Sequence, residues 1–269
     1  MASDRISPTA HYTAYVWVQN GLSHPALGTE RGRRMYTALR PFNAIWARLA
    51  SRSNLEQHLL TRHRSLDDLL NEAVVSGAVG QVIELAAGLS GRGLRLSRAY
   101  PNLSYIESDL PPMAIEKCAR LDGAALRGPR HQVIALDALE TDPSSPLSLE
   151  AVCATLDPKV GTAIITEGLL GYLPPEVVAG LWRRIGTVLR RFPTGLYLSD
   201  LYLGDDVADS RAVRGFRLAL GAFVRGKTYT QARSVDETRQ ILGDAGFGAI
   251  QIHQLHGGWV RTLEARIRP

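Results

Sequence analysis

Four short apolar runs each carry an acid or a glycine at or just after their ends, in a pattern that suits binding of a nucleoside. Asp109 follows YIES, Asp137 follows HQVIAL and Glu167 follows GTAIIT, while Glu84 lies inside the first run, QVIEL. A carboxylate in such a place can accept hydrogen bonds from ribose hydroxyls or from an adenine amino group. Gly88 lies in the turn AAGLSGRG after the first run, where a missing side chain permits close approach of a ligand. Together these features outweigh a purely structural interpretation.

The glycine turn does not match a site for a dinucleotide phosphate. A dinucleotide fingerprint needs G-x-G-x-x-G before a helix, and the segment 88–93 reads GLSGRG, with serine in place of the second glycine. Glu84 would also bring negative charge close to a phosphate. The spacing instead fits a ligand without phosphates, whose amino-acid and ribose parts lie across the turn. Asp109 is the expected ribose ligand, and Glu107 is its rival on the same face of the strand.

The elements that would position these residues alternate between strands and helices. The expected strands are residues 81–85, 103–108, 131–136, 161–166 and 195–200, and the helices between them are residues 92–100, 111–126, 149–156 and 174–191. Such alternation predicts an α/β protein with a doubly wound, Rossmann-like parallel sheet. Its ligands bind beyond the carboxyl ends of the strands. A capped helix over 234–245 and a hairpin of residues 249–255 and 259–267 should end the sheet with an antiparallel pair.

The residues before the sheet divide into an irregular and a helical part. Residues 1–34 are punctuated by proline and glycine, which predicts irregular structure. Residues 35–49 show helical spacing, with a break or kink expected at Pro41. Residues 54–60 and 66–75 are expected to form further helices.

Five motifs give the sequence a resemblance to a known family. They are RHRSLDDLL (62–70), VIELAAGLSGRGLRL (82–96), YIESDLPP (105–112), ALDAL (135–139) and TEGLLGYLPPE (166–176). In order and spacing they resemble the leucine carboxyl methyltransferase family of S-adenosylmethionine-dependent methyltransferases. That family includes bacterial O-methyltransferases of polyketide and other small-molecule pathways. The resemblance covers roughly residues 60–247. It implies a class I methyltransferase fold, with S-adenosyl-L-methionine as cofactor and S-adenosyl-L-homocysteine as product.

The resemblance also implies a role for each motif. Arg62 would pair with the carboxylate of the methionine part in a bidentate contact, with Arg64 as its rival, and Glu167 would face the methionine amino group. The other residues of the predicted cofactor site are Glu84 and Gly88 in the loop motif, Asp109 for the ribose, and Asp137 with the backbone of Ala138 for adenine. The chain departs from the family in the loop, where Ser90-Gly91 replaces the usual Asp-Thr and Ala86 replaces a common glycine.

With the resemblance in place, the chain divides into four regions. They are a helical N-terminal arm or cap (1–80), an S-adenosylmethionine-binding core (81–200), a lid insertion (201–233), and a last helix with the terminal hairpin that completes the core (234–269). The arm and the insertion are expected to form the acceptor pocket, since both combine aromatic with basic residues. The predicted pocket residues are Tyr15, Trp17, Tyr172 and Arg225. The alternative is that both regions cover the core as a lid without contacting substrate.

Composition narrows the class of protein. The 269 residues are 45% hydrophobic and 21% charged, with a net charge of +5 and short basic clusters such as residues 31–34. Those clusters are either solvated helix faces or an attraction for an anionic small molecule. Neither a nucleic-acid-binding module nor an apolar run long enough for a bilayer is present, so no nucleic-acid or membrane partner is expected. With no export signal and two cysteines, Cys118 and Cys153, outside any metal or redox spacing, we expect reduced core thiols in a cytoplasmic protein.

The predicted reaction is methyl transfer to an oxygen, either a carboxylate or an acidic hydroxyl, of a small and partly planar secondary metabolite. No histidine among the seven stands out as a general base, and an ionised acceptor needs none. No catalytic residue or metal site is therefore assigned. The alternatives are N-methylation of a small heterocycle and a regulatory protein that binds the cofactor without catalysis. A nicotinamide-dependent oxidoreductase is disfavoured by the loop spacing and the terminal hairpin, and the sequence leaves the oligomeric state open.

Overall fold

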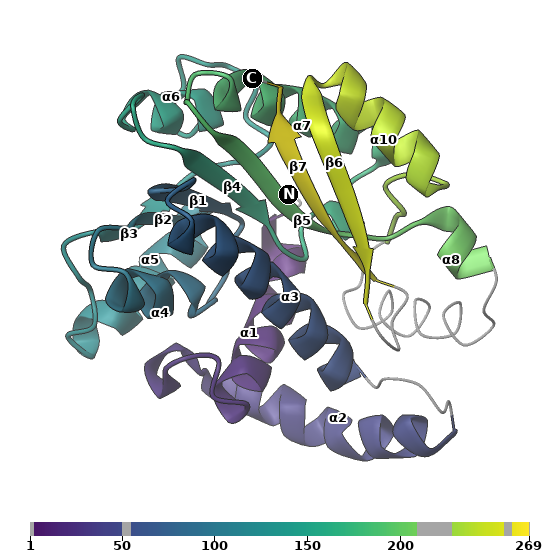
Figure 1. Ribbon diagram of the computed structural model, residues 1–269. Coiled ribbons are helices and arrows are strands. Elements are labelled where there is room, and N and C mark those ends of the chain that lie inside the picture. The colour runs from purple at the N-terminus through teal and green to yellow at the C-terminus, as the bar shows by residue number, and fades with distance from the viewer. Residues whose placement is uncertain (1–2, 50–54, 209–227, 256–259, 269) are drawn as a thin grey trace.

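A computed structural model of the protein describes residues 3–49, 55–208, 228–255 and 260–268 (Figure 1). Its centre is a seven-stranded sheet in the order β3-β2-β1-β4-β5-β7-β6. The strands are β1 (Gln81–Leu85), β2 (Ser104–Asp109), β3 (His131–Ala135), β4 (Thr162–Thr166), β5 (Gly195–Leu201), β6 (Phe247–Gln254) and β7 (Arg261–Ile267). The first five run parallel, and β7 pairs antiparallel with both β5 and β6. The predicted sheet with its antiparallel hairpin is confirmed.

Helices cover both faces of the sheet, which explains why its central strands are continuous apolar runs. Every residue of β1, β4 and β5 is buried. One face is covered by α3 (Leu55–Val75), α4 (Arg92–Ala99) and α5 (Pro111–Gly123), and the other by α6 (Leu149–Ala154), α7 (Pro175–Leu189) and α10 (Val235–Asp244) (Figure 1). The crossovers reverse direction between β1 and β4, so the carboxyl ends of these two strands open a crevice for ligand.

The N-terminal region is more helical than its sequence predicts. Residues 1–34 were expected to be irregular, but they contain α1 (Ser3–Gln19), the short helix η1 (Pro25–Leu27) and the start of α2 (Glu30–Leu49). Tyr12, Val16 and Trp17 recur at helical spacing, and all three are buried in a cluster with residues of α3 and the loop after β1. Burial of that face stabilises α1 although its local sequence is a poor helix former, because tertiary packing supplies most helix stability.

Two expected interruptions of helices are absent. α2 continues across Pro41 to Leu49, so the helix does not break there. The predicted helices at 54–60 and 66–75 form one helix, α3, that starts at Leu55. The polar residues Arg62 and His63 between them are buried. Helices were predicted from apolar periodicity, and these polar residues interrupt that periodicity. One continuous helix was therefore predicted as two.

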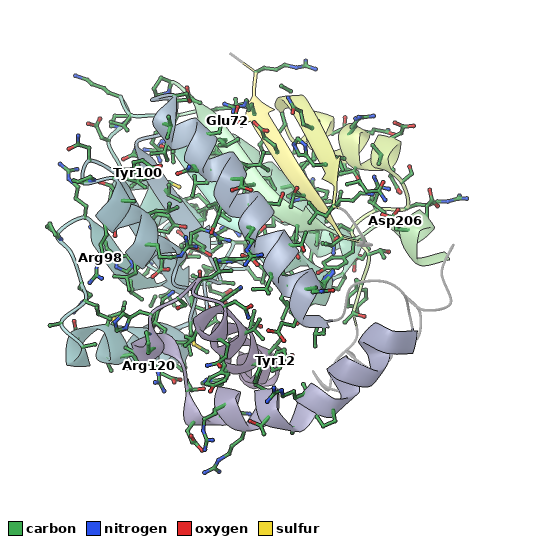
Figure 2. All side chains as sticks on the ribbon, turned by 60° about the horizontal axis from the view of Figure 1, so that its bottom comes forward. Tyr12, Glu72, Arg98, Tyr100, Arg120 and Asp206 are labelled. Atoms are coloured by element: carbon green, nitrogen blue, oxygen red, sulfur yellow. The ribbon has the colours of Figure 1, made fainter. Side chains whose placement is uncertain are left out.

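The C-terminal elements form as their end signals predict. Ser234 caps α10 by accepting a hydrogen bond from the backbone of Glu237 (3.2 Å), and Gly246 beyond its end has φ +97. Between β5 and α10, α8 (Gly204–Ala208) is tied to β7 by Asp206, which pairs with Arg261 at 2.7 Å (Figure 2). Within the described residues no helix combines the length and the apolar character that crossing a membrane requires. Cys153 is buried as expected, whereas Cys118 is only partly buried.

Candidate functional site

A pocket opens at the carboxyl ends of β1 and β4, beneath α1. Its floor is the segment from Ala86 to Leu89 after β1, and Glu167 and Gly168 after β4. One wall comes from α1 and α3, and Tyr12, which is 1% exposed, lies where α1 meets the rest of the molecule (Figure 2). The described residues of the walls are Thr9, Ala10, Tyr12, Thr13 and Trp17 of α1, Leu55, His58, Leu59 and Arg62 of α3, and Glu84, Gly171, Tyr172, Tyr202, Thr228 and Tyr229.

The turn after β1 has a conformation that few side chains tolerate. Gly88 has φ +51, in the left-handed region that glycine adopts without strain. A side chain there would also approach Ala10 of α1, since an added Cβ would lie 3.2 Å from its methyl group. Ala86 has φ +52 and carries the strain that the usual glycine would avoid. At Gly88 the turn therefore brings the backbone to the pocket surface.

Asp109 and Glu107 occupy different environments and contact opposite ends of the turn, since Asp109 lies beside Gly88 and Glu107 accepts a hydrogen bond from the backbone of Gly93 (3.2 Å). The Asp109 carboxylate accepts hydrogen bonds from the backbone of Gly88 (2.7 Å) and of Leu110 (2.8 Å) at the end of β2. Glu107 is fully buried between β2 and α5, where it pairs with Lys117 (3.0 Å) and His131 (2.7 Å). Glu107 is thus committed to the interior, and Asp109 is the acid placed beside the ligand loop.

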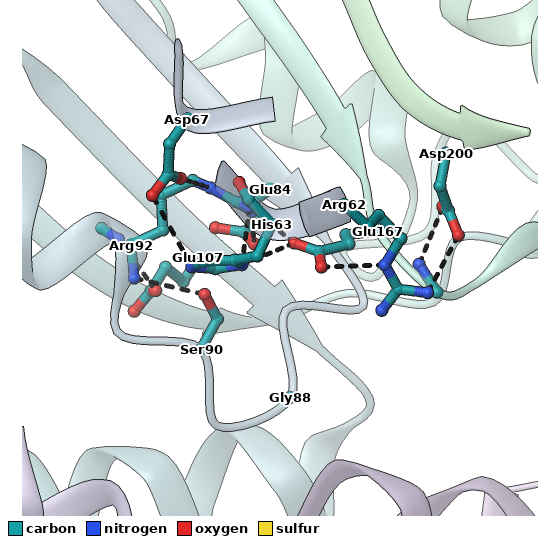
Figure 3. Close-up of polar contacts among 12 residues, drawn as sticks. Arg62, His63, Asp67, Glu84, Gly88, Ser90, Arg92, Glu107, Glu167 and Asp200 are labelled. Atoms are coloured by element: carbon teal, nitrogen blue, oxygen red, sulfur yellow. Dashed lines mark hydrogen bonds and ion pairs between the residues drawn. The ribbon is translucent and has the colours of Figure 1, made fainter. Parts of the chain in front are cut away.

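Eight charged or ionisable residues meet behind the pocket in what we call the ion cluster, and Figure 3 labels all of them except Arg95. They are Arg62, His63, Asp67, Glu84, Arg92, Arg95, Glu167 and Asp200. Arg92 is its centre, since its guanidinium contacts Asp67 (2.6 Å), Glu84 (2.6 Å) and Glu167 (2.5 Å) and is 0% exposed. The three arginines face four carboxylates, so the cluster carries a net charge of −1 when His63 is neutral.

Arg62 projects from α3 into the pocket, and its rival Arg64 is exposed to solvent. Its Nε donates to Glu167 (3.0 Å), and its Nη1 donates to Asp200 (3.1 Å) and to the hydroxyl of Tyr202 (3.1 Å). Among the described residues Nη2 has no hydrogen-bond acceptor, and it lies next to Gly168. Two donor hydrogens of Arg62 therefore remain available at the pocket.

Burial and pairing set the ionisation of these groups. Burial alone would raise the pKa of Glu167, but His63, Arg92 and Arg62 hold it well below its ordinary value. Burial raises the pKa of Asp109, and its two backbone hydrogen bonds only partly offset this. Burial and the nearby charge of Arg62 lower the pKa of His58 to about 3. His58 is therefore a neutral imidazole at physiological pH, and Glu167 is a carboxylate.

The remaining predicted residues lie at different distances from this pocket. Trp17 and Tyr172 line it, and the Trp17 ring packs on His63 with centroids 4.5 Å apart. Tyr15 is not part of its lining and packs on Tyr36 of α2 at 5.4 Å. Arg225 lies outside the described residues.

Asp137 and Ala138 follow β3, further along the same edge of the sheet, and do not line the pocket. The Asp137 carboxylate accepts from the backbone of Leu139 (2.9 Å), and the Ala138 carbonyl accepts from Arg184 (3.1 Å). The basic cluster at 31–34 is solvated, with Arg33 and Arg34 paired to Glu30 on the surface of α2.

Comparison with known proteins identifies the family. The sequence profile of the leucine carboxyl methyltransferases matches residues 26–186, which is more than half of the chain. The chain belongs to the leucine carboxyl methyltransferase family. The resemblance seen in the five motifs is confirmed.

Curated relatives of this family member include two bacterial proteins provisionally named S-adenosyl-L-methionine-dependent methyltransferases. The protein from Mycolicibacterium gilvum is 35% identical over 136 residues, which are 50% of this chain and 42% of that protein. The protein from Streptomyces coelicolor is 35% identical over 130 residues, 48% of this chain and 43% of that protein. The match thus spans less than half the length of these relatives.

Solved structures share the fold of this leucine carboxyl methyltransferase family member at low identity. A possible exported protein from Bordetella parapertussis aligns with a TM-score of 0.61 and 17% identity, over 100% of this chain and 97% of that one. Magnesium protoporphyrin IX methyltransferase from Synechocystis PCC 6803, with bound S-adenosylhomocysteine, aligns with a TM-score of 0.52 and 16% identity, over 80% and 87%. These likenesses establish the class I methyltransferase fold.

Several residues of the site in this family member were missed from the sequence. His58, Arg92, Asp200 and Tyr202 all contact the pocket or the ion cluster. Asp200 closes the fifth apolar run, GLYLSD, so the rule that selected the other strand-end acids also applies to it. His58 lies four residues before Arg62, which places both on one helix face.

Proposed function

We propose that this protein is an S-adenosylmethionine-dependent methyltransferase that methylates an oxygen of a small, partly planar molecule. The observation that carries the proposal is the placement of Arg62 and Glu167 opposite the Gly88 turn, in one pocket at the carboxyl ends of β1 and β4. A carboxylate and a guanidinium side by side suit the two charged groups of an amino acid. Family membership and the S-adenosylhomocysteine bound to the Synechocystis enzyme support the same cofactor.

The donor set of the pocket fits that cofactor. Nη2 of Arg62 would hold the methionine carboxylate through one nitrogen, which replaces the two-nitrogen contact expected from the sequence. Glu167 would face the ammonium, Gly88 would lie under the cofactor and Asp109 would accept from the ribose. Asp137 and Ala138 would contact adenine beyond the pocket. The cofactor has a net charge of +1, which the negative ion cluster complements.

S-adenosylmethionine supplies an activated methyl group when it is bound. The protein contributes position and exclusion of water. α1 closes the pocket over the Gly88 turn, and Trp17, Tyr172 and Tyr229 present flat aromatic surfaces to an acceptor. Holding two reactants in line can lower a barrier by about 7–11 kcal/mol. No side chain has to form a covalent bond, so positioning is the main task of this chain.

Calorimetry with S-adenosylhomocysteine tests the cofactor, with Arg62→Ala against Arg64→Ala as matched variants. Arg62→Ala should weaken binding by about thirtyfold or more, because it truncates a charged hydrogen-bond partner. Arg64→Ala should bind as the parent does, because Arg64 is exposed. Binding of NAD with no binding of S-adenosylhomocysteine would disprove the cofactor assignment. Equal loss in both variants would disprove the role of Arg62.

Product analysis tests the acceptor atom. After turnover of an acceptor with a ¹³C-labelled methyl donor, an O-methyl carbon shift in the NMR spectrum supports the proposal, and an N-methyl shift contradicts it. Cofactor binding without any turnover of acceptors from cell extracts would favour a regulatory protein.

A further inference from the structure

The described wall of the pocket contains one arginine and two glutamates, and all three side chains already have partners. Arg62 pairs with Glu167 and Asp200, Glu84 pairs with Arg92, and Glu167 also pairs with Arg92. Among the described lining residues there is no lysine, and Arg62 is the arginine. The one cation in the described wall, Arg62, is therefore already paired with carboxylates when an acceptor binds.

The two free hydrogens on Nη2 of Arg62 do not provide a binding site for an anionic acceptor. Under the proposed function its two Nη2 hydrogens hold the methionine carboxylate, so none is left for a second anion. Arg62, Glu167 and Tyr202 are among the described groups that face His58. Because Arg62 and burial keep this imidazole uncharged, His58 does not supply a positive charge either.

The other described residues of the wall are neutral and suit a flat molecule. Leu55 and Leu59 of α3 are apolar, and Trp17, Tyr172 and Tyr229 offer aromatic surfaces. The hydrogen-bonding groups between them are hydroxyls and an imidazole, as in Thr9, Thr13 and His58. Such groups satisfy a hydroxyl or carbonyl oxygen. They do not compensate the desolvation of a buried carboxylate, which needs a charged partner.

We propose that the methyl acceptor is an uncharged planar molecule that is methylated on a hydroxyl group, and not a carboxylate. This inference rests on the proposed function. It selects the hydroxyl from the two kinds of acceptor oxygen that the sequence left open, a carboxylate and an acidic hydroxyl. The hydroxyl oxygen forms a bond to the methyl carbon, the electron pair of the broken carbon–sulfur bond stays on sulfur, and the hydroxyl proton is released to the bulk solvent outside the pocket.

The test measures binding of a matched pair of probes to protein saturated with S-adenosylhomocysteine. 2-Naphthol and 2-naphthoate share one ring system, and at pH 7 the phenol is neutral while the carboxylate is ionised. By calorimetry, 2-naphthol should bind at least about tenfold more tightly than 2-naphthoate, because only the anion loses solvation without gaining a cation. Equal or tighter binding of 2-naphthoate would overturn the inference, as would the absence of binding of 2-naphthol.

Two variants that add a positive charge test whether the pocket wall sets the preference for the neutral probe. Leu55→Lys puts a cation at a residue that lines the pocket, and Gln57→Lys adds the same charge to an exposed position in the same turn of α3. Leu55→Lys should raise the affinity for 2-naphthoate by about tenfold, and Gln57→Lys should leave it unchanged within about twofold. A gain in both variants would show that the pocket wall does not set the preference and would contradict the inference.

The two proposals fail in distinguishable ways. If S-adenosylhomocysteine does not bind, the proposed function is wrong. If it binds and 2-naphthoate is preferred, only the assignment of a neutral acceptor is wrong. Loss of that preference in Arg225→Ala would then assign the cation to the insertion.

Discussion

Replacing Arg92 with methionine tests the ion cluster at its centre. Arg92 is 0% exposed and contacts three carboxylates at 2.5–2.6 Å, so the variant leaves Asp67, Glu84 and Glu167 without their shared cation. Removing one partner from a buried ion pair typically costs about 3–5 kcal/mol. Methionine fills a similar volume, and the loss should therefore reflect charge and not a cavity. We expect the free energy of unfolding to fall by about that amount at pH 7.

The loss should depend on pH with a definite sign. In the native protein the pKa values of Glu167 and Asp67 are lowered by their cationic neighbours, against the effect of burial. Each contributes stability that is present above its unfolded pKa of about 4 and disappears as the pH falls through the folded value. Arg92→Met removes much of this contribution at neutral pH. The difference between the two proteins should therefore be largest at pH 7 and shrink below about pH 4.

Urea unfolding followed by circular dichroism at pH 7, 5 and 3 measures both effects. The double variant Arg92→Met/Glu84→Gln serves as the matched comparison, because it also removes one of the stranded charges. It should recover about 1–2 kcal/mol relative to Arg92→Met alone. A cost below about 1 kcal/mol for Arg92→Met, or a difference that grows as the pH falls, would refute the role given to Arg92.

Three further predictions test other parts of the molecule. Asp109→Ala should weaken S-adenosylhomocysteine binding by about tenfold or more in calorimetry. Glu107→Gln should lower the free energy of unfolding and leave the affinity of the folded protein nearly unchanged. Weaker binding in Glu107→Gln with normal binding in Asp109→Ala would exchange the roles of the two acids. Ala86→Gly should raise the free energy of unfolding by up to about 1 kcal/mol, since it removes left-handed strain at φ +52; a lower urea midpoint would contradict this. The folded pKa of His58 is about 3, below its unfolded value of about 6.5, so the free energy of unfolding falls as the pH drops between these values. His58→Gln should reduce this slope by up to about 1.4 kcal/mol per pH unit in urea unfolding, and an unchanged slope would contradict the assignment.

The sheet could be predicted from sequence because its strands are short continuous apolar runs, each ended by a turn or an acid. The prediction that acids at the ends of apolar runs lie at the carboxyl edge of the sheet is confirmed in position for Asp109 and Glu167. It could not distinguish Asp109 from Glu107, because both lie on the same face of β2. Glu107 pairs with Lys117 of α5 and His131 of β3. Because these partners are distant in sequence, the residues around Glu107 do not predict the pairing.

The centre of the ion cluster was beyond sequence analysis for the same reason. Arg92 looks like an ordinary first residue of a helix, and its partners Asp67, Glu84 and Glu167 come from α3, β1 and the turn after β4. Only the fold brings these four segments together. α1 was missed because proline and glycine punctuation outweighed a weak apolar periodicity. Its stability depends on a surface that lies elsewhere in the chain.

The packing of α1 has a consequence for biosynthesis. Its buried face, with Tyr12 and Trp17, meets Leu59, Leu89 and Met113, so the surface that covers it is translated up to about a hundred residues later. At about 5–20 residues per second, the nascent segment waits several seconds for that surface. An isolated helix of this length is marginal in water, and its apolar side chains are open to chaperones during that interval. The wall that α1 gives to the pocket can therefore form only after the segments that carry Leu59, Leu89 and Met113 have been made.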